Sequence, residues 1–359
     1  MKEIYEVASM FLPNEAIVNC STLGNGHINT TYLVTTENCK YVLQKINTSI
    51  FKDVDALMSN IQGVTHFIRN KHRNDGRSYE NRTLHFIPSP DKKRYLSHNG
   101  NAYRMYIYID NVFTVDKMER VENFYSAGLG FGEFANILSD FDASQLHETI
   151  KNFHNTPSRY NDFENAVKAN LSGRLNEVLP EVEFIRARKD FTSLFVDKLS
   201  NGTLPLRVTH NDTKINNILF DNKTGEPVAV IDLDTVMPGS YLYDFGDAIR
   251  SGATYAAEDE RDLSIVIFDL ELYEAFTKGY LTMCGKSLTP MEIEMLPYAS
   301  IMLTLECGMR FLTDHLNGDT YFRISREGHN LDRARTQFTL VQQMENNIDK
   351  MKEIINKYL

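Results

Sequence analysis

The sequence predicts an α+β chain, in which a small antiparallel β-sheet with one helix is followed by a larger, mainly helical part. Two observations support this fold class. Before about residue 110, short β-branched runs alternate with turn residues, whereas later in the chain the apolar residues recur with a period of 3.6. The 359 residues are also enough to fill two lobes, which we expect at residues 1–109 and 110–359.

The first predicted hairpin carries a glycine-rich turn. Gly24 and Gly26 come before the β-branched run 28–34, and residues 41–44 are typical of the next strand. Glycine lets backbone N–H groups approach a phosphate closely. The turn is therefore expected to lie over the phosphates of a nucleotide.

Two further segments complete the expected first lobe. Residues 53–70 have the apolar periodicity of a helix, with Asp53 or Asp55 near its start. Residues 102–109 form a strongly β-prone run, which is the expected crossing between the lobes.

The second lobe is expected to be helical except where short strands interrupt it. Helical patterns occur at about 124–141, 258–284, 290–316 and 330–359. The strands of the interruption are expected at 206–208, 218–220 and 228–231. The acidic run at 258–260 is expected to form a first helical turn that complements the helix dipole.

The interruption holds the residues with the clearest chemical meaning. A polar loop contains Asp212 and Asn217, and the apolar run 228–231 leads to Asp232. An aspartate, an asparagine five residues later and an aspartate after an apolar strand have the spacing of a kinase catalytic loop and its metal-binding aspartate. The pattern predicts phosphoryl transfer. Asp212 would accept the proton of an acceptor hydroxyl, and Asn217 and Asp232 would bind Mg²⁺ at the nucleotide phosphates.

Composition and charge limit the class of partner. A formal net charge of −10 argues against nucleic acid or an anionic membrane surface as the main partner. The N-terminus lacks the apolar segment of a signal peptide, and no apolar run approaches the length of a bilayer span. We therefore expect a cytoplasmic enzyme. The 4 cysteines are scattered, which indicates neither a zinc site nor a disulfide framework.

Several longer segments carry a resemblance to a known family. They are residues 24–34, 207–214, 231–235, 238–240, 244–247 and 306–311. Through them the chain resembles the aminoglycoside phosphotransferase and choline kinase superfamily over nearly its whole length, and within it the N-acetylhexosamine 1-kinase branch. The resemblance implies a two-lobed protein-kinase-like fold. It also implies transfer of the γ-phosphoryl group of ATP, with Mg²⁺, to the anomeric hydroxyl of N-acetylglucosamine or N-acetylgalactosamine.

The resemblance implies roles for individual residues as well. Asp212 would be the general base, Asn217 and Asp232 the Mg²⁺ ligands, and Asp244 a brace for the catalytic loop. The nucleotide would be bound by Gly24, Asn25, Gly26, Asn29, Gln44, Tyr108 and Ile109. The sugar would be held by His27, Asp234 and Arg310, whose plainer alternatives are a loop-tip histidine, a turn carboxylate and a helix-surface arginine. Asp247 and Arg250 are expected to form a local salt bridge.

One position departs from the protein-kinase pattern. Where the third strand usually offers a lysine to the phosphates, this chain has Gln44, and Lys45 lies on the opposite face of the strand. The predicted helix contains no Glu between residues 56 and 70 to pair with such a lysine. A neutral Gln can donate a hydrogen bond, but without the charge-assisted strength of an ammonium group.

Three functions from different classes remain open. The first is the N-acetylhexosamine 1-kinase, and the second is a kinase of the same fold for an aminoglycoside, choline or homoserine. The third is a nucleotide-binding scaffold without activity, which the presence of Asp212, Asn217 and Asp232 disfavours. The neutral sugar is preferred over a polycation because Arg310 in an acceptor site would repel positive charge.

Overall fold

The computed structural model describes residues 1–24, 28–76, 78 and 80–359, and the chain divides into two compact units. Unit 1 comprises residues 1–113, 140–151 and 219–238, and unit 2 comprises residues 114–139, 152–218 and 239–359. An antiparallel sheet and a larger helical part confirm the predicted α+β class. The lobes expected at 1–109 and 110–359 stay a prediction, since each unit is assembled from three separate segments.

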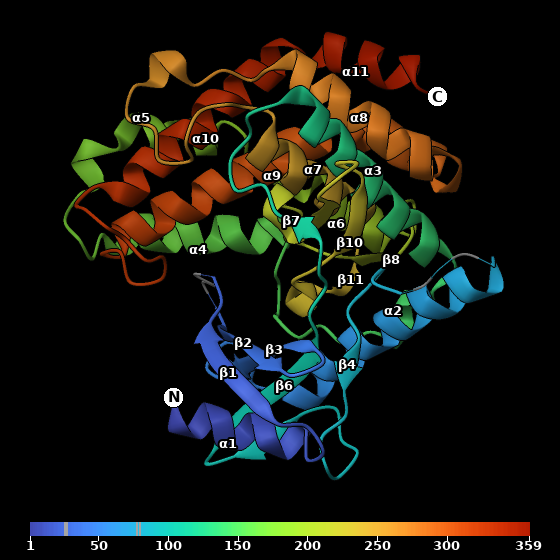
Figure 1. The fold of residues 1–359 in the computed structure, drawn as a ribbon. Coiled ribbons are helices and arrows are strands. Elements are labelled where there is room, and N and C mark those ends of the chain that lie inside the picture. The colour runs from blue at the N-terminus through green and yellow to red at the C-terminus, as the bar shows by residue number, and fades with distance from the viewer. Residues whose placement is uncertain (25–27, 77, 79) are drawn as a thin grey trace. The chain divides into compact units, whose positions relative to one another are not determined.

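The main sheet of unit 1 is antiparallel, with the strand order β1-β2-β3-β6-β4 and with β5 paired to β6 (Figure 1). Its strands are β1 (Ile17–Thr22), β2 (Thr30–Thr36), β3 (Lys40–Ile46), β4 (Phe86–Ile87), β5 (Leu96–His98) and β6 (Asn101–Ile107). The strands predicted in the first lobe correspond to β2, β3 and β6. Pairing of β3 with β6 sets Gln44 opposite Arg104.

One face of this sheet packs against α1 (Lys2–Phe11), a helix that the sequence analysis did not predict. Val7 and Phe11 of this helix join Val34, Leu43 and other apolar residues in a buried core. Ile4, Val7, Ala8 and Phe11 are its buried residues, and their spacing places them on one side of the helix. The helix thus shields one face of the small sheet from water.

The predicted helix at 53–70 is confirmed as α2 (Val54–Asn74). The Asp53 side chain caps its N-terminus by accepting a hydrogen bond from the backbone N–H of Ala56 at 2.9 Å. Successive strand residues point to opposite faces of a sheet, so Arg104 points away from the core formed with α1. Its Nη1 lies 3.9 Å from Sδ of Met58 in α2.

A second, three-stranded sheet in unit 1 carries the predicted metal-binding aspartate. It has the order β10-β9-β7 and is formed by β7 (Val112–Phe113), β9 (Ile218–Asp221) and β10 (Pro227–Val230). The strands predicted at 218–220 and 228–231 are confirmed. Asp232 follows β10 and precedes a 3₁₀ turn, Leu233–Thr235, after which the chain enters β11 (Met237–Gly239).

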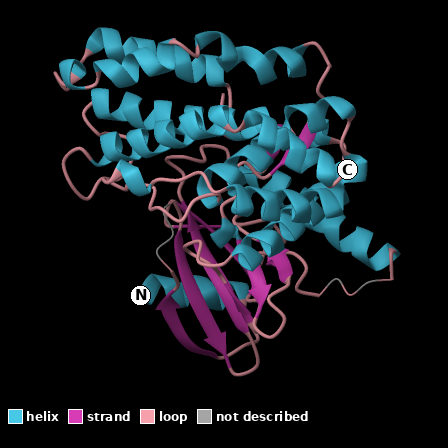
Figure 2. Ribbon diagram, turned by 90° about the horizontal axis from the view of Figure 1, so that it is seen from above, coloured by secondary structure: helices cyan, strands magenta, loops and turns pink. Residues whose placement is uncertain are grey.

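Unit 2 is mainly helical (Figure 2). Its helices are α3 (Val121–Ile137), α4 (Thr156–Ala169), α5 (Leu179–Arg186), α6 (Leu194–Ser200), α7 (Tyr241–Gly252), α8 (Leu270–Cys284), α9 (Pro290–Leu316), α10 (His329–Asn346) and α11 (Ile348–Lys357). The short strand β8 (Arg207–Thr209) leads into the polar loop with Asp212. Among the described residues, no helix is both long and apolar enough to cross a bilayer.

The predicted helical turn at 258–260 is wrong, because α8 begins only at Leu270, after the N-cap Asp269. The acidic residues upstream form ion pairs with arginines instead. Glu258 lies 3.1 Å from Arg250, and Asp259 lies 3.2 Å from Arg326. Interactions with distant parts of unit 2 therefore override the local preference of acidic residues for a helix start.

Helices α3 and α8 of unit 2 cross at glycines. A Cβ at Gly128 would collide with the carbonyl oxygen of Phe276, and a Cβ at Gly279 would come within 2.8 Å of the backbone nitrogen of Leu129. Since these obstacles are backbone atoms, they cannot move aside as a flexible side chain can. The close approach of the two helices thus requires both glycines.

Gly128→Ala is expected to lower the free energy of unfolding by about 1–3 kcal/mol, because the added methyl group overpacks this crossing. Urea denaturation measures the change. Gly63→Ala in α2 is the control, since its Cβ would lie 3.8 Å from Cζ of Phe141. The control should be neutral or stabilising by up to about 1 kcal/mol, the usual gain from Gly to Ala in a helix. Equal effects of the two substitutions would contradict a tight crossing.

Candidate active site

The catalytic loop predicted from the sequence holds Asp212 and Asn217 together in unit 2. Nδ2 of Asn217 donates to the backbone carbonyl of Asp212 at 2.8 Å and to its carboxylate Oδ2 at 3.1 Å. Asn217 ends a 3₁₀ turn, Ile215–Asn217, and is buried, whereas the Asp212 side chain keeps 31% of its surface exposed. The loop thus presents an oriented carboxylate that solvent or a ligand can reach.

Asp244, in the first turn of α7, braces the backbone of this loop as expected. Its carboxylate accepts hydrogen bonds from the N–H of His210 at 2.8 Å and of Asn211 at 2.7 Å. Asn211 adopts a left-handed conformation with φ of 66°, which an Asn tolerates better than most residues. The hydroxyl of Thr213 donates to the backbone carbonyl of Asp244 at 2.6 Å. These bonds fix the chain on both sides of Asp212.

Burial dominates the electrostatics of Asp244. Desolvation raises the pKa of its carboxyl to about 6, against the opposing influence of His210, the two backbone N–H donors and His154. The loop is therefore braced by a carboxylate that takes up a proton more readily than an ordinary aspartate.

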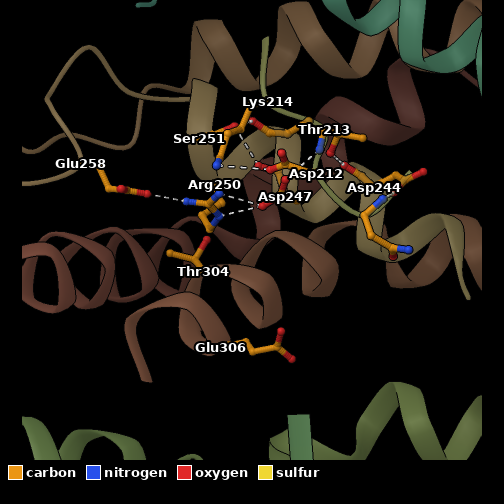
Figure 3. A network of polar contacts seen from close by, with 12 residues as sticks. Asp212, Thr213, Lys214, Asp244, Asp247, Arg250, Ser251, Glu258, Thr304 and Glu306 are labelled. Carbon is orange, nitrogen blue, oxygen red and sulfur yellow. Dashed lines mark hydrogen bonds and ion pairs between the residues drawn. The ribbon is translucent and has the colours of Figure 1, made fainter. Parts of the chain in front are cut away.

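Asp247 and Arg250, one turn further along α7, form the predicted local salt bridge at 2.8 Å. The pair also reaches the catalytic loop, because Asp247 accepts a hydrogen bond from the N–H of Thr213 at 2.9 Å (Figure 3). Arg250 extends the network to Glu258 at 3.1 Å. Both charged groups of the pair are buried, so the network makes α7 a rigid support for the loop.

Lys214 was not assigned a role from the sequence, yet its Nζ lies 3.2 Å from Oδ1 of Asp212 (Figure 3). The charge of Asp212 raises the pKa of this ammonium group, although burial opposes it. A cationic side chain therefore accompanies the candidate base. In the sequence, only its position two residues after Asp212 could have indicated that Lys214 lies beside the candidate base.

In unit 1, Arg104 connects three residues that the sequence analysis placed at the nucleotide or the sugar. Its guanidinium forms an ion pair with Oδ1 of Asp234, and its Nε donates to Oε1 of Gln44 at 2.9 Å. The side-chain amide of Asn29 donates to Oδ2 of Asp234. Nε2 of Gln44 in turn donates to the hydroxyl of Thr31 at 3.1 Å. The predicted residues Asn29, Gln44 and Asp234 thus meet around one arginine.

Arg104 and Asp234 are deeply buried, with 3% exposure of each side chain. Burial alone would lower the pKa of Arg104, but the Asp234 carboxylate holds that pKa above its usual range. Arg104 is thus a buried positive charge next to Gln44, and it is paired with Asp234. Alternation along the strand 102–109 could have indicated it, since Arg104 is the charged residue between Tyr103 and Met105, which face the core.

The other predicted site residues have different surroundings. Gly24 adopts the left-handed φ of 67°, whereas Asn25, Gly26 and His27 lie outside the described residues. The N–H of Tyr108 donates to the carbonyl of Lys40 at 3.0 Å, and Ile109 is buried.

Asp232 and Arg310 complete the predicted set. Asp232 has a left-handed backbone, with φ and ψ both 56°. Arg310 on α9 lies 5.9 Å from the ring centre of Phe153 and 5.6 Å from that of Phe322. One turn earlier on α9, buried Glu306 accepts hydrogen bonds from the hydroxyl of Thr156 at 2.6 Å and pairs with Nδ1 of His154 at 2.8 Å. No sequence pattern indicated a role for Glu306.

Part of the chain matches a known family, and solved structures share its fold. Residues 117–279 match the Phosphotransferase enzyme family. A microcompartment-associated aminopropanol kinase superposes with a TM-score of 0.63 at 16% identity, covering 97% of this chain and 98% of its own. An aminoglycoside phosphotransferase from Alicyclobacillus acidocaldarius gives 0.64 at 12% identity, with 98% and 96% covered. An ethanolamine kinase from Plasmodium vivax gives 0.55 at 16% identity, with 94% and 89% covered.

These similarities confirm the predicted kinase-like fold over almost the whole chain. The match to the Phosphotransferase enzyme family covers residues 117–279, which is less than half of the 359-residue chain. At 12–16% identity the solved structures establish the fold alone.

Arg104→Met is expected to cost about 3–5 kcal/mol of unfolding free energy, because it leaves the Asp234 carboxylate buried without its counter-charge. Replacing both partners, Arg104→Met with Asp234→Leu, should cost less than the single change, since no isolated charge remains. Chemical denaturation of the wild type, both single variants and the double variant gives the coupling energy. Additive losses would contradict direct pairing.

The raised pKa of Asp244 predicts a characteristic pH dependence of stability. Between about pH 4 and pH 6 the folded chain binds a proton at Asp244 that the unfolded chain has released, so this group's contribution to stability falls as pH rises. Asp244→Asn removes that titration. The stability of the variant relative to wild type should therefore improve by up to about 3 kcal/mol from pH 4 to pH 7. Parallel stability profiles from urea denaturation would show that Asp244 titrates normally.

Proposed function

We propose that this chain is an ATP-dependent kinase of N-acetylhexosamines. It would phosphorylate N-acetylglucosamine or N-acetylgalactosamine at the C1 hydroxyl and release the sugar 1-phosphate and ADP. The observation that carries the proposal is the catalytic loop, in which Asn217 orients the Asp212 carboxylate beside Lys214. The choice of sugar rests on segments 24–34 and 306–311, which resemble those of N-acetylhexosamine 1-kinases.

Asp212 is the proposed general base. As the acceptor oxygen bonds to the γ-phosphorus and the bond from that phosphorus to the bridging oxygen of ADP breaks, the hydroxyl proton passes to the Asp212 carboxylate. Asn217 engages one carboxylate oxygen, Oδ2, and the backbone carbonyl of the same residue. The orientation is therefore set before the substrates arrive, which lowers the reorganisation that the reaction requires.

Lys214 is proposed to stabilise charge on the transferred group. Phosphoryl transfer spreads negative charge over the equatorial oxygens, and a lysine close to the base is suited to receive it. Because the Asp212 carboxylate raises the pKa of Lys214, the ammonium stays charged at neutral pH.

Asn217 and Asp232 are the proposed ligands of Mg²⁺, for which their hard oxygen atoms are suitable. The amide nitrogen of Asn217 is used by Asp212, so the amide oxygen is the atom that a cation would bind. Bound Mg²⁺ would neutralise charge on the nucleotide phosphates.

For the acceptor, Arg310, Asp234 and His27 remain the proposed contacts. Arg310 is set against two aromatic rings, an arrangement that keeps its guanidinium in place as a donor to a neutral sugar. Both oxygens of Asp234 are engaged, by Arg104 and by Asn29, so a direct contact with the sugar would add to an existing network.

The second candidate is a kinase of another small alcohol, such as an amino alcohol or an aminoglycoside. It is favoured by the names of the similar structures, which include an aminopropanol kinase and an ethanolamine kinase. These acceptors are cationic, and an acceptor site with Arg310 would disfavour them. We therefore keep the neutral amido sugar as the first candidate.

Incubation with Mg-ATP and either N-acetylhexosamine is expected to yield the sugar 1-phosphate, detected by NMR as an anomeric proton coupled to phosphorus. Asp212→Asn should lower kcat by roughly 100-fold or more while ATP still binds, the range for loss of a positioned base. Asp116→Asn, at an exposed residue of unit 2, is the control and should act like wild type.

Other products separate the alternatives. Phosphate at C6, or turnover only with choline, amino alcohols or aminoglycosides, would support the second candidate and leave the role of Asp212 intact. Nucleotide binding without turnover on any acceptor would instead indicate a scaffold.

A further inference from the structure

A cavity of about 480 Å³ lies within unit 1, and none of the residues that line it is assigned to catalysis. It is bordered by α2, by β4 and the loop that follows it, and by residues 141–146. Its volume falls in the range of pockets that bind small molecules. The lining residues are Ser59, Gln62, Gly63, Thr65, His66, Arg69, Phe86, Pro88, Lys92, Lys93, Arg94, Phe141, Gln145 and Leu146.

The charge of this cavity contrasts with that of the whole chain. Four of the lining residues are Lys or Arg and none is Asp or Glu, although the chain carries a formal net charge of −10. Lys93 is paired with Asp91 at 2.9 Å. Within the described part of the chain, the side chains of Arg69, Lys92 and Arg94 have no hydrogen bond or ion pair to another residue. Three uncompensated cations therefore border one small cavity.

Arg69 provides a second and independent observation. Its Nη1 is buried and finds no hydrogen-bond partner among the described residues. The folded chain thus retains an unsatisfied donor at this place. A buried guanidinium N–H without an acceptor is costly in free energy. Burial, followed by the charge of Arg73, lowers the pKa of Arg69, which also indicates that positive charge is poorly compensated there.

We propose that this cavity is a binding site for a small phosphorylated metabolite, separate from the active site. A phosphate group suits the planar donors of Arg69 and Arg94, since guanidinium groups bind phosphate through two parallel hydrogen bonds. Lys92 adds a further positive charge. Phe86 and Phe141 offer apolar surface to the remainder of the ligand. The volume is too small for a polymer such as nucleic acid or a folded partner.

The site goes beyond the proposed sugar kinase activity and does not depend on it. Its ligand would compete with neither ATP nor the acceptor for the same side chains, because none of the lining residues belongs to the candidate active site. Binding is therefore tested on the full chain without turnover, by calorimetry with inorganic phosphate, N-acetylglucosamine 1-phosphate and AMP as separate probes. The probe that binds most tightly identifies the kind of phosphorylated ligand.

Arg69→Gln and Arg94→Gln should each weaken binding of the best probe by about tenfold or more, the loss expected for a charge-assisted contact of about 1.4 kcal/mol. Lys52→Gln is the matched control, since it removes the same charge from an exposed residue of unit 1 outside the cavity. Its binding should stay within about twofold of wild type. Binding to the active site instead would survive in all three variants and would overturn the proposal.

Stability gives a readout that distinguishes a ligand site from a structural arginine. Without any phosphorylated probe, Arg69→Gln should melt no lower than wild type, because it removes an unsatisfied buried charge. On addition of the best probe, the Tm of wild type should rise while that of Arg69→Gln should not. If Arg69→Gln unfolds without ligand, Arg69 is structural and the proposal is wrong. Failure of wild type to bind any probe at millimolar concentration would also overturn it.

Discussion

The buried ion pair between Arg104 and Asp234 is the interaction on which the arrangement of unit 1 depends. Two charges removed from water are stable only as partners, so wherever β6 places Arg104, the turn after β10 must place Asp234. The carboxylate also accepts a hydrogen bond from the amide of Asn29, and the guanidinium donates one to the amide oxygen of Gln44. Strands that are distant in sequence thereby share one electrostatic centre, and Asp232 is held two residues from it.

Unit 2 uses carboxylates for a different purpose. Asp244 and Asp247 accept hydrogen bonds from the backbone of the loop around Asp212. The loop needs such partners because it contains a left-handed Asn211 and leaves regular secondary structure on both sides. Rigid helix α7 thus supplies the order that an irregular loop cannot generate by itself.

The sequence predicted what depends on local pattern. The strands around Asp212, the helix α2 with its cap at Asp53 and the Asp247–Arg250 pair follow from residues close in sequence, whereas the Asp244 brace was implied by the family resemblance. Alternation along its strand could indicate that Arg104 points away from the core, but not its ion pair, because the partner Asp234 lies in a different segment of unit 1. The acidic run at 258–260 failed for the same reason, since Arg250 and Arg326 decide its conformation. Sequence patterns predict interactions between residues that are close along the chain. The pairing of buried charges depends on residues that are close only in the folded structure.

The division of unit 1 into three segments has a consequence for synthesis on the ribosome. Residues 1–113, which contain every strand of the main sheet, emerge long before residues 219–238. Chains generally begin to fold from the N-terminus as they emerge, yet Arg104 has no carboxylate partner until Asp234 has been translated. In the nascent sheet Arg104 must therefore stay hydrated. The sheet can pack tightly around Arg104 only after the segment that contains Asp234 has been synthesised.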